Sequence, residues 1–208
     1  MQIKIEIEEY ANKGFENRVT NRAPLMKELS LKALSAIQKN VESGIGPENK
    51  PLTKEVKRGD KTLRDSGKLR ASLTARSSES EAVVGTNVPY ARVHNPEDGK
   101  TETVISAKGG KSLALPASAK TRKLFRMYGW SAREVIAGLE SKKYSVYRPY
   151  KKGTKVRSNV IMAKKKGEAA FAVFILKKSV KIPARPFMFL PDSVIAALER
   201  RVSDFYAS

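Results

Sequence analysis

The sequence predicts an α+β fold, with an antiparallel or mixed sheet packed with a long N-terminal helix and a C-terminal helix, plus an inserted basic α/β subdomain. Three patterns support this fold class. Apolar residues alternate at the N-terminus, recur at helical spacing in two later stretches, and form one strongly apolar run between those stretches. With 208 residues and 40% hydrophobic side chains, the chain suits one core that carries an insertion.

The first strand and the first helix follow each other closely. Ile3, Ile5 and Ile7 lie on one side of an extended chain, and charged residues lie on the other, which predicts a half-buried strand. From Pro24 to Val41 the apolar residues recur about every four positions, and Gly44 follows them. This spacing predicts a helix with one buried face that stops near the glycine.

Two further strands are expected before residue 90. Leu69, Ala71 and Leu73 alternate with polar residues after a turn or short helix at Arg64–Gly67, which predicts a strand. The run Glu81–Gly85 supplies the next strand. Both strands would join the sheet on which the long helix packs.

The strongest strand signal lies at Phe171–Ile182, whose centre is apolar at successive positions. Such a run indicates a central strand that is buried on both faces. Further on, Val194, Leu198, Val202 and Phe205 mark one face of a C-terminal helix.

The segment between this strand and this helix contains two prolines around an arginine. Pro183 and Pro186 lack backbone N–H groups, so the strand should end near Ile182 and Arg185 should be extended. Phe187 can then dock on the core. Two roles remain open for Arg185: its guanidinium caps nearby carbonyls of a rigid joint, or it contacts another subunit.

The positive charge is concentrated in one part of the chain. The whole sequence has a net charge of +20, and Thr101–Lys166 holds 17 Lys or Arg but only 3 Asp or Glu. Two short helices separated at Gly129 and a hairpin with basic turns are expected there. We therefore divide the chain into a core domain, residues 1–100 and 167–208, and an inserted basic subdomain, residues 101–166.

The predicted hairpin carries a candidate electrostatic surface with tyrosines between the cations. It could contact DNA phosphates while the tyrosines stack on bases, or it could meet an acidic protein. Alternatively, the tyrosines form cross-strand pairs and the cations are a solvated face. The eight cations are Arg148, Lys151, Lys152, Lys155, Arg157, Lys164, Lys165 and Lys166.

The composition leaves little basis for catalysis. The chain has no cysteine, and its one histidine, His94, precludes a multi-histidine metal site. No phosphate-binding loop, nucleophile elbow or evident carboxylate pair is present. We expect no enzymatic activity, no cofactor, no metal and no membrane contact, in a soluble protein made in the cytoplasm.

Four motifs occur in a fixed order: "LRDSGKLRASL", "VGTNVPYARVHN", "KSLALP" and "LKKSVKIPARPFMFLP". Together they resemble the phage virion morphogenesis proteins, the tail-completion family of Mu-like and related contractile-tailed phages and prophages. The family pattern also matches at Ile182–Phe187, within the last motif. The earlier positions that match the family pattern, and that we take as structural, are Asp65, Gly67, Gly85, Pro89, Tyr90 and His94.

The resemblance implies a non-enzymatic virion protein, assembled in the cytoplasm of the bacterial host, that acts in tail completion or head–tail joining at the neck. It implies a homo-oligomeric ring whose partners are other phage tail or neck proteins. Positive charge inside a channel would hold DNA, so we favour an acidic protein partner for most of the basic surface, with non-specific DNA contact also open. The alternative function is a basic nucleic-acid-binding protein that uses residues 101–166.

Overall fold

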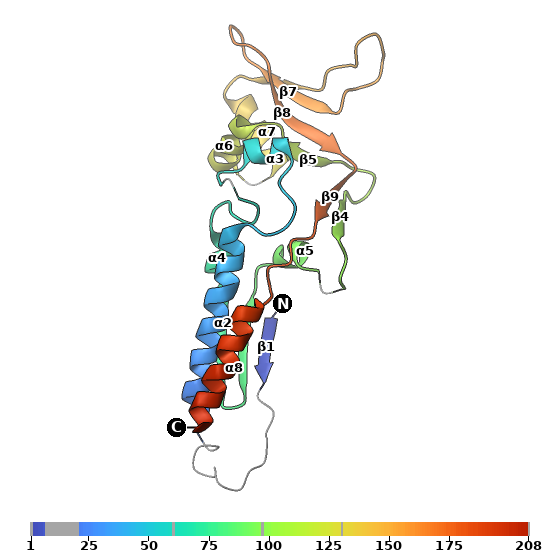
Figure 1. The fold of residues 1–208 in the computed structure, drawn as a ribbon. Coiled ribbons are helices and arrows are strands. Elements are labelled where there is room, and N and C mark those ends of the chain that lie inside the picture. Colours follow the sequence, from blue (N-terminus) through green and yellow to red (C-terminus); the bar gives the residue numbers. More distant parts are fainter. Residues whose placement is uncertain (1, 7–20, 60, 97, 130, 208) are drawn as a thin grey trace. The chain divides into compact units, whose positions relative to one another are not determined.

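The computed structural model describes residues 2–6, 21–59, 61–96, 98–129 and 131–207 (Figure 1). It contains helices and antiparallel sheets, which confirms the α+β prediction. The chain divides into two compact units. Unit 1 comprises residues 1–48, 59–103 and 183–208, and unit 2 comprises residues 49–58 and 104–182.

The sheet of unit 1 has three antiparallel strands in the order β1-β3-β2. These strands are β1 (Gln2–Glu6), β2 (Leu73–Ser77) and β3 (Glu81–Thr86). Ile3 and Ile5 pack against the core as the alternation predicts. The third member of that pattern, Ile7, lies outside the described residues.

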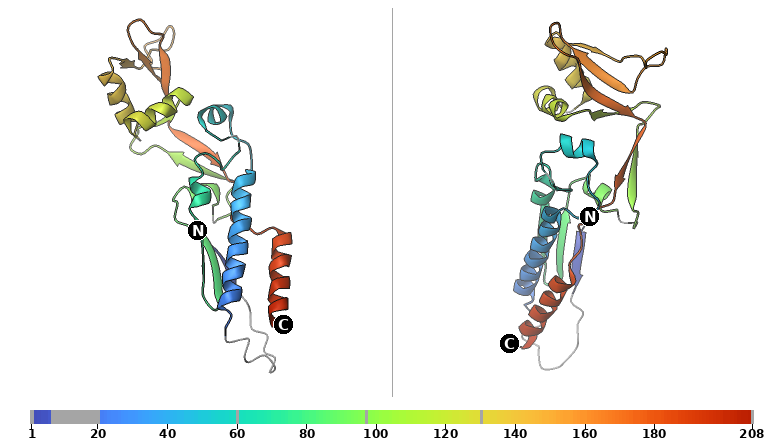
Figure 2. Two further views of the ribbon diagram at one scale, coloured as in Figure 1. Left: turned by 90° about the vertical axis from the view of Figure 1, so that its left-hand side faces the viewer. Right: turned by 45° about the horizontal axis from the view of Figure 1, so that its top comes forward.

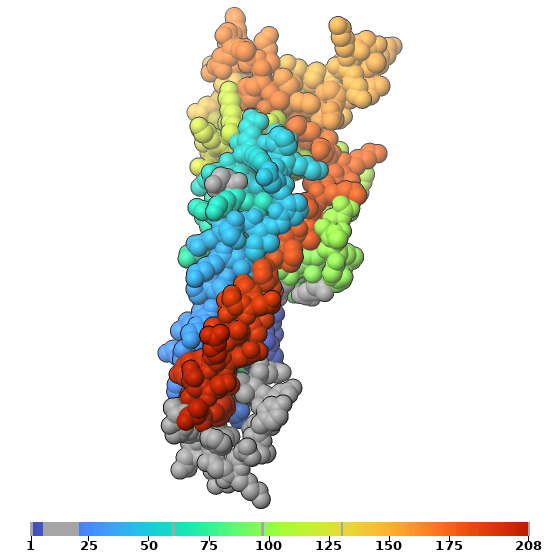
Figure 3. All heavy atoms as spheres, in the orientation of Figure 1, coloured from blue at the N-terminus to red at the C-terminus, as the bar shows by residue number. Residues whose placement is uncertain are grey.

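Two long helices complete unit 1. Helix α2 (Ala23–Ser43) ends at Gly44, and helix α8 (Asp192–Ala207) closes the chain. Figure 2 shows α2 beside the sheet, and Figure 3 shows α8 lying along α2. The predicted apolar faces of both helices are the buried ones: Ala33, Ile37 and Val41 pack towards the sheet, and Leu198 packs against Leu25 and its neighbours.

The sequence-based strand at residues 69–73 is partly wrong. Residues Lys68–Ala71 form the short helix α4, and β2 begins only at Leu73. Leu69 and Leu73 are both buried, and they are four residues apart. A helical turn followed by a strand therefore buries the same two leucines as a continuous strand does, and the pattern alone does not separate the two. A second short helix, α5 (Ala91–His94), follows β3.

Unit 2 is built on a four-stranded antiparallel sheet in the order β5-β8-β7-β6. Its helices α6 and α7 pack on it through Leu124, Val135 and Leu139, and both have serine N-caps. The elements of this unit are α3 (Pro51–Val56), β5 (Leu113–Pro116), α6 (Ala119–Tyr128), α7 (Ala132–Ser141), β6 (Ser145–Tyr147), β7 (Val160–Lys164) and β8 (Phe171–Lys177).

The run Phe171–Ile182 forms two strands rather than one. After β8, the strand β9 (Ser179–Pro183) pairs with β4 (Glu102–Ser106) in a separate two-stranded sheet. The strand β8 is central and buried as expected, but its sheet belongs to unit 2.

The two compact units differ in their bounds from the predicted core domain and insertion. Unit 2 extends to Ile182 and also includes residues 49–58, which the sequence-based division gave to the core domain. The apolar run of β8 predicts burial, but it carries no information about which core the strand enters.

Candidate functional site

Three of the four motifs meet within unit 1. The Ser72 and Thr86 hydroxyl groups of the first and second motifs are 2.7 Å apart. The backbone N–H of Arg185, in the last motif, donates to the carbonyl of His94 at 2.6 Å. The motifs thus form one structural cluster from segments that are far apart in sequence.

Arg185 is the buried centre of this cluster. It is only 5% exposed, and its Nε donates to the carbonyl oxygen of Pro47 at 2.9 Å. Burial lowers the pKa of the guanidinium below its ordinary value. The contact is that of the carbonyl-capping alternative, and a residue so enclosed offers little surface to another subunit.

Gly46 packs directly against this arginine. A Cβ atom at Gly46, where φ is +85°, would lie 2.7 Å from Cγ of Arg185. Glycine is therefore required there both by the left-handed backbone and by the close approach of the arginine.

Two asparagines fix the chain that follows the prolines. Asn95 Oδ1 accepts the backbone N–H groups of Phe187 and Met188, and Asn40 Nδ2 donates to the carbonyls of Phe187 and Phe189. Phe187 is fully buried in the core of unit 1. These hydrogen bonds pair two backbone N–H groups and two backbone carbonyls of an irregular segment.

Sequence reasoning missed both asparagines. A signal was present for each: Asn40 is a polar residue on the apolar face of α2, and Asn95 closes the second motif. The prolines that bracket Arg185 differ in exposure, since Pro183 is half-buried and Pro186 is exposed.

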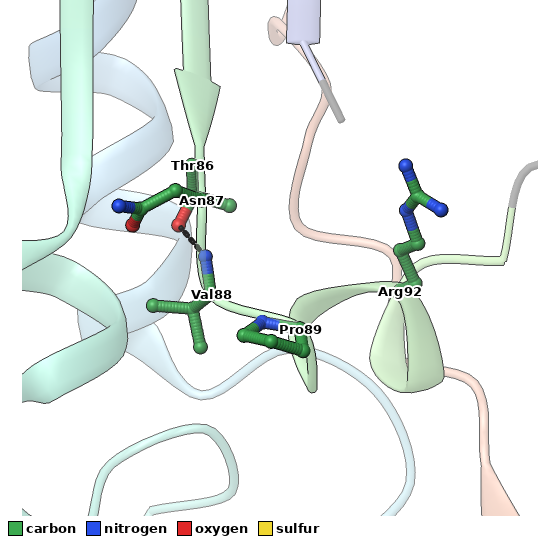
Figure 4. A pocket seen from close by; sticks show the side chains of 5 residues that line it. All are labelled: Thr86, Asn87, Val88, Pro89 and Arg92. Carbon is green, nitrogen blue, oxygen red and sulfur yellow. Dashed lines mark hydrogen bonds between the residues drawn. The ribbon is translucent and has the colours of Figure 1, made fainter.

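A surface pocket of about 430 Å³ lies at the second motif (Figure 4). Its lining residues are Thr86, Asn87, Val88, Pro89 and Arg92. The Thr86 hydroxyl accepts the backbone N–H of Val88 at 3.2 Å and so shapes the turn at its wall.

The neighbouring motif residues also reach the surface. Tyr90 is exposed, and its pKa is raised by partial burial and by the negative charge of Asp65. Asp65 and Gly67 are exposed, whereas Gly85 lies inside β3 between Gln2 and Thr74. The charge of Asp65 therefore acts on an exposed tyrosine of the second motif.

The eight predicted cations form two groups, not one surface. Five of them, from Arg148 to Arg157, lie in the loop between β6 and β7, and three, Lys164 to Lys166, lie at the turn between β7 and β8. These connections are at opposite ends of β7 because the three strands are antiparallel neighbours. Seven of the cations are exposed and Lys165 is half-buried.

The β6–β7 loop is ordered by its own cations. Arg148 Nε donates to the carbonyl of Ser158, and Arg157 donates to the carbonyl of Arg148. The Arg157 guanidinium also lies 4.1 Å from the centre of the Tyr150 ring, which remains 55% exposed. At the other end of β7, the Tyr144 hydroxyl donates to Glu168, and its ring packs edge-on against Phe171. Tyr144 and Tyr150 thus contact other residues of the same unit, while Tyr150 keeps an exposed surface.

The two units differ completely in charge. Unit 2 contains 24 of the 41 Lys and Arg residues and 4 of the 21 Asp and Glu residues, which leaves unit 1 with 17 of each kind. The net charge of +20 therefore resides entirely in unit 2.

Among the described residues, no group of three or more His, Cys, Asp or Glu is placed to hold a metal ion. His94 is half-buried, and its backbone carbonyl is part of the Arg185 joint. Within the same described ranges, no helix is long and apolar enough to cross a membrane.

Comparison with known proteins adds two findings. The model of the phage virion morphogenesis family matches residues 5–126, more than half of the chain. The chain is also 38% identical over 97 residues to the Mu-like prophage FluMu G protein 2 of Haemophilus influenzae. That alignment covers 47% of this chain and 63% of the relative, so the chain spans less than two thirds of the relative's length. No solved structure shows significant similarity to the chain.

Proposed function

The chain belongs to the phage virion morphogenesis family, and we propose that it is a structural protein that acts in tail completion or in head–tail joining at the neck. The family match over residues 5–126 carries this proposal. It includes the first two motifs, and residues of the second motif line the pocket at Thr86–Arg92. The similarity to a Mu-like prophage protein supports the same role in phage assembly.

We propose that the protein works as a homo-oligomeric ring and is a component of the virion, assembled in the cytoplasm of the bacterial host. In this proposal the exposed motif face of unit 1, with Asn87, Tyr90 and Arg92, contacts the neighbouring subunit. Arg185, Phe187 and the two prolines act inside the subunit as a joint, because Arg185 and Phe187 are buried. The ring would bind other phage tail or neck proteins, and no catalytic step or cofactor is part of this role.

The charge difference between the units supports different partners for each of them. Unit 1 is electrically balanced, which suits repeated contacts between identical subunits. Unit 2 would present its positive charge to an acidic neighbouring protein, because like charges on adjacent subunits need an opposite charge to offset their repulsion.

A second candidate function is non-specific contact with DNA through unit 2. The observation that favours it is the concentration of all the net charge in that unit, together with exposed tyrosines beside the cations of the β6–β7 loop. Such contact would weaken steeply as the salt concentration rises, because binding releases counterions from the DNA phosphates.

The leading proposal is tested by deleting the gene from a phage or prophage that produces virions. We expect filled heads and unjoined tails in electron micrographs of the lysate, with joined particles restored by the gene supplied in trans. Normal yields of joined, infectious particles from the deletion strain would refute the proposal.

A further inference from the structure

The sheet of unit 1 has an open strand at each edge. In the order β1-β3-β2, both β1 and β2 pair with β3 alone among the described residues. Each edge strand is five residues long. An unpaired edge presents a row of backbone N–H and C=O groups to which a further strand can hydrogen-bond. Two edges of equal length therefore lie on opposite sides of one sheet.

The apolar side chains at both edges are incompletely buried. On the side of the sheet that packs against the helices, Ala82 and Val84 of the central strand are fully buried. Ile3 and Ile5 of β1 and Ala75 of β2 lie beside these residues in the pairing register, yet all three are only half-buried. A strand added along each edge would cover them. The burial pattern thus indicates a neighbour at both edges.

The strand directions favour one way of joining two copies. Both β1 and β2 are antiparallel to β3, so they run in the same direction. Neighbouring copies in a ring are related by rotation about one axis, so β2 of one copy can pair in parallel with β1 of the next, and this contact repeats around the ring. Pairing of β1 with β1, or of β2 with β2, is a two-fold contact that closes as a dimer and leaves the other edge unpaired.

The charges of unit 1 suit a second copy of the chain as the neighbour. Unit 1 has 17 basic and 17 acidic residues, so two copies of it carry no net charge that would repel. At the β1 edge, Lys4 forms an ion pair with Glu81 at 2.5 Å, which offsets its charge within the same subunit. The β2 edge carries a single charged residue, Arg76. A strongly acidic partner is suited to unit 2 instead.

We propose that β2 of one copy and β1 of the next copy pair as parallel strands, so that the three-stranded sheets join into one continuous sheet around the ring. The proposal rests on the ring function proposed above and identifies the backbone contact that holds neighbouring subunits together. Thr86, the last residue of β3, lies opposite Leu73, the first residue of β2. The Thr86–Arg92 face therefore follows at one end of the proposed contact.

Cysteine cross-linking tests this contact because the chain has no cysteine of its own. Gln2 and Thr74 are both exposed, and both lie opposite Gly85 on the two sides of β3. Within one subunit they are separated by two strand spacings, about 9–10 Å. A disulfide does not form between residues whose Cα atoms are more than about 7 Å apart. The double variant Gln2→Cys with Thr74→Cys can therefore link only different copies.

The double variant is oxidised as purified full-length protein and in virions of a phage that carries it, and the products are separated on non-reducing gels. We expect a ladder of covalent oligomers that ends at a fixed copy number, whereas either single variant forms at most a dimer. Gln2→Cys with Arg76→Cys tests the register shifted by two residues, which keeps the same side chains outward. Gln2→Cys with Ser35→Cys is the matched control, since Ser35 is an exposed residue of α2, and it should give no ladder.

A ladder in virions alone would support a contact that forms on assembly. Three results would overturn the proposal: no ladder from either edge pair in both preparations, a ladder of equal yield in the control, or a single variant that forms dimers as abundantly as the double variant forms its ladder. Virions that lack the protein would refute the assembly function itself. A ring seen in virions that gives no ladder would refute only the edge contact, so the two failures can be told apart.

Discussion

Asn95 Oδ1 accepts hydrogen bonds from the backbone N–H groups of both Phe187 and Met188, at 2.9 and 2.8 Å. The side chain that ends the second motif thus satisfies two donors of the last motif. Because the segment after Pro186 has no strand or helix to pair with, these donors depend on this one amide oxygen.

Asn95→Ala should therefore destabilise unit 1 by about 2–6 kcal/mol, since each of the two donors left without a partner costs about 1–3 kcal/mol. Asn95→Asp keeps the acceptor atoms and should lose much less. Urea unfolding followed by far-UV circular dichroism measures both variants. An Asn95→Ala protein as stable as the unmodified chain would show that these hydrogen bonds contribute little.

The pair Gly46 and Gly67 tests the packing of Arg185. Both have positive φ angles, +85° and +78°, but a Cβ at Gly46 would lie 2.7 Å from Arg185 Cγ, whereas a Cβ at Gly67 would meet nothing within 4 Å. Gly67→Ala should cost about 1–2 kcal/mol for the left-handed backbone alone. Gly46→Ala should cost at least about 1 kcal/mol more, because the arginine must also shift.

Thermal or urea unfolding of the two alanine variants gives this difference directly. Because the backbone strain is nearly equal at the two positions, the difference reports the contact with Arg185. Equal destabilisation would mean that Arg185 moves aside at no cost, and that the joint is not rigid.

The periodic elements were the predictable part of this fold. The helices α2 and α8 and the strands β1, β3 and β8 follow directly from apolar spacing, because burial on one side of an element leaves a regular pattern. The partition into two units did not follow. The apolar run of β8 fits any buried sheet, so only the tertiary pairing with β5 and β7 assigns it to unit 2.

The site was predictable in its motifs but not in its contacts. The sequence indicated that Arg185 lies in an extended segment between prolines, yet the carbonyl it caps belongs to Pro47, in a distant loop. Asn40 was missed for a similar reason. A single asparagine or arginine acquires its role from residues that are far away in sequence, and no local pattern records that proximity.

Tyr90 should show the proximity of the first two motifs in its titration. Its pKa is raised first by burial and then by the charge of Asp65. The difference between the ultraviolet titrations of the unmodified protein and of Tyr90→Phe gives the titration of Tyr90. We expect its midpoint to lie above pH 10, the ordinary value. Asp65→Asn should lower that midpoint part of the way.

The raised pKa of Tyr90 also makes the stability of the fold depend on pH. The folded protein holds the tyrosine proton more tightly than the unfolded chain, so the contribution of Tyr90 is complete below pH 10 and is lost as the pH rises through the raised pKa. An ultraviolet titration in which Asp65→Asn leaves the midpoint unchanged would show that the two motif residues do not interact.

The β6–β7 loop distinguishes a protein partner from DNA. If DNA is its ligand, replacing Lys151, Lys152 and Lys155 by Gln should reduce the slope of log K against log salt by about 3, one unit for each phosphate contact. We expect weak DNA binding and a change of less than about 1 in this slope. The triple change of Lys164, Lys165 and Lys166 to Gln, at the other end of β7, is the matched control. If the slope falls by about 3 in the loop variant and not in the control, DNA and not an acidic protein is the ligand of the loop.

We propose that several copies of this chain form a ring at the head-proximal end of the phage tail. Cryo-electron microscopy of purified virions from a phage that encodes the protein measures this directly. We predict a single ring of repeated copies at that position, with the Thr86–Arg92 face of unit 1 between neighbouring subunits. Density for the protein along the tail tube or within the capsid, or a virion that contains no copy of it, would contradict the account.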